Sequence, residues 1–411
     1  MHPIRTLASL LTSTIVVCAL AWPLPTPYSD GFGTAAFAQT KKRTPRKAPP
    51  KAVPTSPPGL PARTPFTAED QAAAKVAGIP DARVWGDDDT EFARVLPTGT
   101  GPWLALSGGG ADGAYGAGLV AGWTQAGNRP EFTLVSGVSI GALIAPYAFL
   151  GARYDDELRQ NILEITAADV FEDRPTPESL MDTWPLKRLI ERRVSGALLA
   201  EIAAEHRRGR RLLVATTNLD AGRRVIWNMG AIAERGDDKA LKLFRDVLLA
   251  SSSIPGFFPP IQIEVEANGK TFRELHLDGT VTAPFFVAPE SMFASGAKLP
   301  TKEIYVILNS KLTPDFDTPE RRTISILARS IGVALTTGLR AELLVVTTGA
   351  QRLGIDLHVA SIPDTFRRPI RTLFEQEYMK ALFDLGIEEA KGGAAFARRT
   401  GAVPDLRPNS P

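Results

Sequence analysis

The chain has few of the residues on which disulfides and metal sites depend. Its 411 residues include one cysteine, Cys18, and four histidines. A single thiol cannot form an intramolecular disulfide, and Cys18 lies in an N-terminal apolar run whose removal would leave no thiol. No HExxH pattern, EF-hand loop or cysteine cluster occurs. The sequence therefore predicts no metal and no other cofactor.

Net charge is also small. Lys and Arg number 47 and Asp and Glu 45, which gives a formal net charge of +2 at pH 7. This near balance gives no support to nucleic-acid binding. Hydrophobic residues make up 44% of the chain, enough for a large core, and we expect one large α/β domain rather than two.

The N-terminal part differs in composition from the remainder. Arg5 precedes the apolar run 7–22, which is short for a membrane-spanning helix and typical of a secretory signal. We therefore expect residues 1–38 to be a signal peptide or an N-terminal anchor. Export follows, to the periplasm or in association with the cell envelope. Residues 39–66 are rich in proline and basic side chains and predict an extended linker.

A serine stands at the centre of Gly137-Val138-Ser139-Ile140-Gly141. Residues 132–135 before it are typical of a buried strand, and residues 142–150 after it of an apolar helix. A serine hydroxyl attacks best from a sharp strand-to-helix turn, where small neighbours let the backbone approach and the helix N-terminus favours negative charge. Gly137 and Gly141 are such neighbours, so we predict that Ser139 is a nucleophile.

A glycine-rich loop lies upstream, where the apolar strand 103–106 runs into Ser-Gly-Gly-Gly-Ala-Asp-Gly at residues 107–113. The successive glycines Gly108, Gly109 and Gly110 can turn their N–H groups toward one point and bind an anion. Charge develops at such a point when a serine attacks an ester carbonyl, and loss of one donor typically raises the barrier by about 2.7–4 kcal/mol. We predict an oxyanion hole here.

The helix predicted after this loop is unusually rich in glycine. Gly116, Gly118 and Gly122 each cost roughly 1 kcal/mol relative to alanine in a helix interior. We expect close packing of this helix on the sheet to offset the cost.

The third element is Asp278, which Gly279 and Thr280 follow. The strand-like runs 261–265 and 271–275 flank Asn268-Gly269, the strongest short-range signal for a β-hairpin. Asp278 is then expected just past a strand end, in a loop. From there its carboxylate could take the proton of Ser139 directly.

In this order, the glycine loop, the GxSxG elbow and the later Asp-Gly pair resemble the patatin-like phospholipase family, with the chain as a bacterial, exported member. The stretch Ser-Ser-Ser-Ile-Pro-Gly-Phe-Phe-Pro-Pro at 251–260 resembles the segment that precedes the catalytic Asp of that family. The resemblance implies a three-layer α/β/α sheet and lipid acyl-ester hydrolysis by a Ser139/Asp278 dyad through an acyl-enzyme. The motif glycines that support it are Gly113, Gly137, Gly141 and Gly279.

On this interpretation, residues 67–400 form the acyl hydrolase domain, with a core at about 100–310, a helical C-terminal extension at about 318–400 and a tail at 401–411. We expect the partner to be a lipid or ester substrate that the protein meets at a membrane surface. Many family members carry Arg or Lys where this chain has Asp112. We expect Asp112 to point away from the oxyanion site and to cap the next helix.

Two alternatives stay open. His358, in an apolar strand, would complete the Ser, Asp, His order of α/β-hydrolases, whereas His276 could flank the site without bridging Ser139 and Asp278. The run 108–113 also fits the GxGxxG pattern of dinucleotide-binding modules, with Glu131 near the distance expected of a ribose-binding acid. A nucleotide-binding module, however, has no use for the GxSxG elbow after the next strand.

Overall fold

The computed structural model describes residue 60 and residues 62–370, 372–393 and 395–396, all within the unit Pro54–Pro411. The predicted signal or anchor (1–38), most of the predicted linker and the predicted tail (401–411) lie outside the described residues. Those three predictions therefore stay predictions.

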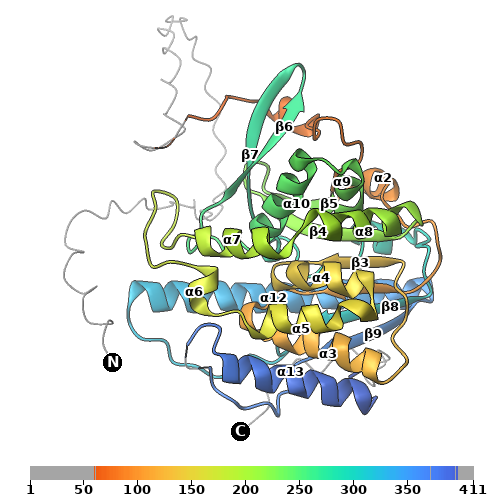
Figure 1. Ribbon diagram of the computed structural model, residues 1–411, viewed down its shortest axis with the longest axis vertical. Helices are drawn as coiled ribbons and strands as arrows, with labels where there is room; N and C mark the ends of the chain where they lie inside the picture. The colour runs from red at the N-terminus through yellow and green to blue at the C-terminus, as the bar shows by residue number, and fades with distance from the viewer. Residues whose placement is uncertain (1–59, 61, 371, 394, 397–411) are drawn as a thin grey trace, which may run out of the picture. The chain divides into compact units, whose positions relative to one another are not determined.

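A nine-stranded sheet forms the centre of the described part of the chain (Figure 1). Neighbouring strands run parallel through its middle, in the order β4 (Arg211–Asn218), β3 (Leu134–Gly137), β2 (Trp103–Leu106), β8 (Glu303–Leu308) and β9 (Asp356–Ser361). Antiparallel strands extend it beyond β4, namely β5 (Arg223–Asn228) and β1 (Arg83–Trp85). The middle strands are buried on both faces, which is why they read as continuous apolar runs.

Helices cover both faces of this sheet, because successive strand residues point to opposite faces. Leu104 and Val135 pack in one core, and Trp103 and Leu134 in the other. The first core includes residues of α3 (Gly113–Gln125), α4 (Ile140–Leu150), α5 (Asp155–Leu163), α6 (Ala167–Val170), α7 (Trp184–Arg193), α8 (Gly196–Arg207), α9 (Met229–Arg235), α10 (Asp238–Ser251) and α13 (Gln376–Lys391). The second includes residues of α2 (Asp89–Ala93), α11 (Glu290–Ser295) and α12 (Thr323–Leu353). The predicted three-layer α/β/α fold is confirmed.

The hairpin predicted around Asn268-Gly269 is also confirmed. Strands β6 (Ile261–Ala267) and β7 (Lys270–Asp278) pair antiparallel up to Ala267 and Lys270, which leaves a two-residue loop. Asn268 and Gly269 have φ values of 51° and 76°, the positive values that a type I′ turn requires. Asp278 is the last residue of β7 rather than a loop residue beyond it.

Close packing explains the glycines of α3, but mainly against another helix. A Cβ at Gly118 would overlap the backbone of Phe383, and one at Gly122 would overlap the backbone of Ile387. Both partners lie in α13. The prediction of packing on the sheet was therefore wrong for these two glycines, because α13 folds back over α3 from far along the chain.

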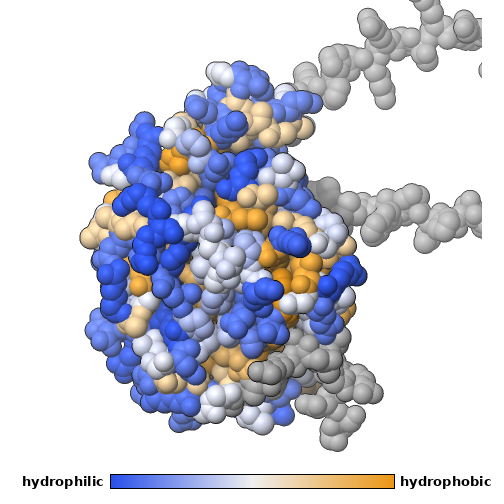
Figure 2. Space-filling model, turned by 90° about the vertical axis from the view of Figure 1, so that its right-hand side faces the viewer, coloured by the Kyte–Doolittle hydropathy of each residue, from blue (hydrophilic) through white to orange (hydrophobic). Residues whose placement is uncertain are grey.

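The C-terminal segment, predicted as a helical extension, also contains β9, the edge strand beside β8. The C-terminal half of α12 packs on the sheet through Leu339 and Leu343, whereas Ile326 and Val333 in its N-terminal half are 50% and 48% exposed. Among the described residues, α12 is the one helix long and apolar enough to cross a membrane by length and composition. Figure 2 shows that apolar residues reach the surface in several groups on the face it displays.

Candidate active site

Ser139 lies on a strained turn between β3 and α4. Its φ of 56° and ψ of −123° are unfavourable for a residue with a side chain and cost on the order of 1–3 kcal/mol. A Cβ at Gly137 would overlap the carbonyl of Gly141, and a Cβ at Gly141 would overlap the carbonyl of Leu106. Both positions of the motif therefore exclude side chains, and the turn has the strand, elbow and helix order of a nucleophile elbow.

The structure brings Ser139 and Asp278 together. Ser139 Oγ donates a hydrogen bond of 2.7 Å to Asp278 Oδ2. Asp278 pairs with Thr216 of β4, and β4 runs directly beside β3. A Cβ at Gly279 would overlap the carbonyl of Ala215 in β4, so glycine lets the chain turn close to that strand. Pairing with β4 thus places Asp278 beside the elbow.

Burial dominates the electrostatics of Asp278, which is 1% exposed. Its Oδ1 accepts hydrogen bonds from the N–H (2.9 Å) and the Oγ1 hydroxyl (2.7 Å) of Thr280. Loss of hydration raises the pKa of Asp278 to about 6, although the bonds from Thr280 and Ser139 favour the charged form. The carboxyl is therefore ionised, and able to accept a proton, above about pH 6.

The serine run 251–253, to which the sequence interpretation gave no role, holds Ser139 and Asp278 in place. The N–H of Ser139 donates to Ser251 Oγ (2.9 Å), and that hydroxyl donates to the carbonyl of Ala215 (2.8 Å). The N–H of Asp278 donates to the carbonyl of Ser253 (2.9 Å). Ser251 and Ser253 are fully buried. The available signal was a run of three serines at the end of an amphipathic helix.

The glycine loop lies against the elbow. The N–H of Gly108 donates to the carbonyl of Pro284 (3.1 Å), so Gly108 does not serve as a free donor beside Gly109 and Gly110. Within the described part of the chain, the N–H groups of Gly109, Gly110 and Ile140 have no acceptor. These three N–H groups are therefore the candidate oxyanion donors.

The loop is packed on both sides. A Cβ at Gly113 would overlap the side chain of Ile140, the residue after the nucleophile. A Cβ at Gly108 would lie 3.2 Å from the Cβ of Ser139. The glycines thus let the loop approach the elbow more closely than any side chain allows.

Asn309, which follows β8, fixes this loop and was not singled out from the sequence. Its Nδ2 donates to the carbonyl of Ser107 (2.8 Å), and its Oδ1 accepts from the N–H of Gly116 (3.0 Å). Its own N–H donates to Ser107 Oγ (2.8 Å). A Cβ at Gly109 would overlap the carbonyl of Asn309. One buried amide therefore joins the start of the loop to the helix that follows it.

We predicted that Asp112 caps α3, but its side chain does not. It occupies the N-cap position, but its side chain makes no capping bond and instead accepts a hydrogen bond from the hydroxyl of Tyr378 (2.7 Å). Burial raises the pKa of Asp112 to about 6, against the bond from Tyr378 and the charge of Lys311. The prediction was wrong because α13, which carries Tyr378, packs over the start of α3.

Neither His276 nor His358 bonds to Ser139 or Asp278. His276 is fully buried, with Nδ1 2.9 Å from Thr216 Oγ1 and Nε2 3.2 Å from Glu274 Oε2. His358 stacks on Tyr305 with ring centroids 4.4 Å apart, on β9. Strand β9 lies three strand spacings from β3 in the sheet, roughly 14 Å. The geometry therefore gives no support to a triad through His358.

The described residues also offer little to a cofactor. Glu131, the candidate ribose-binding acid, is exposed and lies 3.8 Å from Arg208 and Arg210 in ion pairs. The described residues contain no group of three or more His, Cys, Asp or Glu side chains that could hold a metal ion. The glycine loop faces Ser139 instead.

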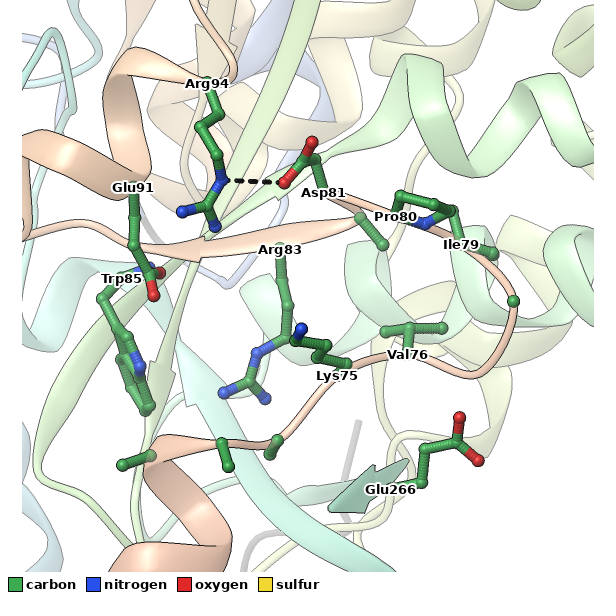
Figure 3. Close-up of a pocket in the computed structure, with 15 residues that line it drawn as sticks. Lys75, Val76, Ile79, Pro80, Asp81, Arg83, Trp85, Glu91, Arg94 and Glu266 are labelled. Carbon is green, nitrogen blue, oxygen red and sulfur yellow. Dashed lines mark hydrogen bonds and ion pairs between the residues drawn. The ribbon is translucent and has the colours of Figure 1, made fainter. Parts of the chain in front are cut away.

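A cavity of about 570 Å³ lies elsewhere, beside β1 (Figure 3). Its lining includes Lys75, Arg83, Glu91 and Glu266, and at its rim Arg94 Nε donates to an Asp81 carboxylate oxygen at 2.9 Å. Neither Ser139 nor Asp278 lines it. We therefore place the candidate active site at the elbow and not in this cavity.

A buried serine hydroxyl bonded to a carboxylate on a strand-to-helix elbow, beside free amide donors, is the arrangement of a serine hydrolase. Residues 104–289 match the family model described as patatin-like phospholipase, a span that contains the glycine loop, the elbow and Asp278. Among solved structures, VipD from Legionella pneumophila aligns with a TM-score of 0.33 and 13% identity, over 72% of this chain and 66% of that chain. The chain thus spans just under two thirds of VipD. No curated protein matches it.

Proposed function

We propose that the protein hydrolyses acyl esters of lipids, with Ser139 as nucleophile and Asp278 as proton acceptor. The observation that carries the proposal is the 2.7 Å hydrogen bond between Ser139 Oγ and Asp278 Oδ2 on a strained elbow. The match of residues 104–289 to a patatin-like phospholipase domain supports lipid as the substrate class.

The reaction follows from the positions of these groups. Ionised Asp278 takes the proton of Ser139 as Oγ attacks the ester carbonyl, and the N–H groups of Gly109, Gly110 and Ile140 stabilise the resulting oxyanion. Collapse of the tetrahedral intermediate forms the acyl-enzyme, and the acid form of Asp278 protonates the departing alkoxide. Water then attacks the acyl group with Asp278 again as base, which releases the fatty acid and restores Ser139.

Burial assists each step. Ser139 is 8% exposed, so few water molecules compete for the amide donors. The N-terminus of α4 points at the site, and its dipole favours negative charge there. Phospholipase A, lysophospholipase and carboxylesterase activities all fit this arrangement. We also propose export to the cell envelope, supported by the apolar run at 7–22, and action at a membrane surface.

A fluorophosphonate probe tests the central assignment. The purified protein should be labelled covalently and should hydrolyse para-nitrophenyl and phospholipid esters, and both signals should vanish in Ser139→Ala. Ser136→Ala is a matched control, since Ser136 lies on β3, the strand before the elbow, and its hydroxyl donates to the carbonyl of Phe286. Labelling that persists in Ser139→Ala, or NAD(P) binding without labelling, would refute the proposal.

A further inference from the structure

A groove beside α12 adjoins the candidate site. Its volume is about 530 Å³, within the range of small-molecule sites. One wall is Pro255 together with residues from the 280–284 segment, and the other is the face of α12 from Ile331 to Val345. Most of the lining is apolar, including Val281, Pro284, Ile331, Ala334, Leu335, Ala341 and Val345.

Two residues of the groove lining bond to residues of the active site. Thr280 lines the groove, and its hydroxyl donates a hydrogen bond to Asp278 Oδ1. Pro284 lines it and accepts the N–H of Gly108, the glycine packed against Ser139. An ester whose carbonyl lies at Ser139 therefore has this groove as the adjoining apolar surface.

Small residues on α12 keep the groove open. Ala334, Gly338 and Ala341 are four and three residues apart, so they share one face of the helix. A Cβ at Gly338 would lie 3.6 Å from Pro284 Cγ, in ordinary van der Waals contact. A longer side chain at Gly338 would consequently fill the space between the two walls.

The polar residues of the groove lining include two acids, Glu290 and Glu342. Glu342 is 8% exposed, and its Oε1 accepts no hydrogen bond from the described residues. Burial and the nearby charge of Glu290 raise the pKa of Glu342 to about 7, although Arg224 opposes this. The two carboxyl groups in the lining disfavour binding of a negatively charged phosphate headgroup. Because Glu342 is partly protonated, placing an apolar chain beside it costs less free energy than placing one beside a fully charged carboxylate.

We propose that this groove binds the acyl chain of the ester substrate and thereby sets its chain-length preference. The inference rests on the proposed hydrolase function and specifies the substrate of that site. Each methylene that enters the groove is expected to raise kcat/KM by up to about fourfold, from the free energy of burying a CH₂ group.

Soluble para-nitrophenyl esters share one alcohol and differ only in the acyl chain, so they measure the effect of acyl-chain length alone. In Gly338→Leu, kcat/KM for the octanoate should fall by about tenfold or more, while kcat/KM for the acetate stays within about twofold. Gly332→Leu is the matched control, because Gly332 lies in the same helix with open space around it. It should leave both esters unchanged. Ala334→Phe, on the exposed rim, should repeat the octanoate loss without disturbing the core.

The outcomes separate the possibilities. Equal losses on acetate and octanoate in Gly338→Leu and Ala334→Phe would overturn the groove. A loss seen only with esters in vesicles would also overturn it and would assign α12 to membrane contact. The wild-type enzyme reports the proposed function independently: no acetate turnover and no fluorophosphonate labelling would refute the hydrolase, whereas a flat chain-length profile with normal labelling would refute only the groove.

Discussion

Thr280 Oγ1 and Ser139 Oγ donate to opposite oxygens of Asp278, at 2.7 Å each. The Thr280 bonds lower the pKa of Asp278 and thus oppose the effect of burial, which raises it. If Asp278 is the base, its pKa appears directly in the pH dependence of the reaction.

We expect kcat/KM to rise with pH through an apparent pKa near 6 and to level off above it, because only ionised Asp278 accepts the proton. Thr280→Val removes one bond to the charged form, so the acidic limb should move to higher pH. Thr280→Ser keeps the hydroxyl and should keep the limb in place. A limb that stays fixed in Thr280→Val would argue against Asp278 as the titrating base.

The Ser251 hydroxyl should matter to catalysis without touching substrate. Ser251→Ala removes the acceptor of the Ser139 N–H and the donor to Ala215. We expect a loss of stability of about 1–3 kcal/mol, the cost of unpaired buried groups, with a fall in kcat. Ser252→Ala is the control, since Ser252 Oγ bonds only to the helical carbonyl of Leu248. Urea denaturation and steady-state kinetics measure both effects.

Asn309 should act through the oxyanion loop. Asn309→Asp keeps Oδ1 for Gly116 but loses the Nδ2 donor to the Ser107 carbonyl. We expect kcat to fall by about tenfold or more with little change in KM, because the displaced amides stabilise the transition state rather than the bound ester. A change confined to KM would show that Asn309 does not position the oxyanion donors.

The histidines give a test of the alternative triad. His358→Ala should leave most of the ester turnover, because His358 stacks on Tyr305 at the far edge of the sheet. His276→Ala should lower stability through its lost bond to Thr216 yet retain turnover in the fraction that folds. Loss of activity in folded His358→Ala would establish the triad instead.

Local motifs carried most of what the sequence could predict. The elbow and the hairpin turn follow from residue types at fixed spacing. The sequence placed Asp278 in a loop just past a strand, whereas Asp278 is the last residue of β7. The three-layer fold was expected from the resemblance to a known family. Contacts between segments remote in the sequence could not be predicted from these local patterns. Asn309, Ser251 and the bond from Tyr378 to Asp112 join parts of the chain that only the folded sheet brings together, and no local pattern marks such partners.

The tight packing of α3 on α13 should appear in stability measurements. Gly118→Ala places a Cβ against the backbone of Phe383, which cannot rotate away, so we expect destabilisation of about 1–3 kcal/mol. Gly196→Ala, in α8 with open space around it, should be neutral or slightly stabilising. Equal midpoints in urea for the two variants would show that α13 yields to the added methyl.

The buried acid should also cost stability. Because the pKa of Asp278 rises from 3.8 to about 6 on folding, the folded state binds its proton more tightly than the unfolded state does. That contribution is fully present below about pH 4 and is lost as pH rises through about 6.

Asp278→Asn, which is neutral at every pH, should therefore be inactive yet more stable than the wild type at about pH 8, by a few kcal/mol at most. The difference should shrink toward zero below about pH 4, where both side chains are uncharged. Asp112 and Glu342 also titrate with raised pKa values, but they are present in both proteins and cancel in the comparison. Urea denaturation of both proteins across this range measures the difference. A gap independent of pH would mean that Asp278 keeps an ordinary pKa, and its role as a base tuned by burial would then be wrong.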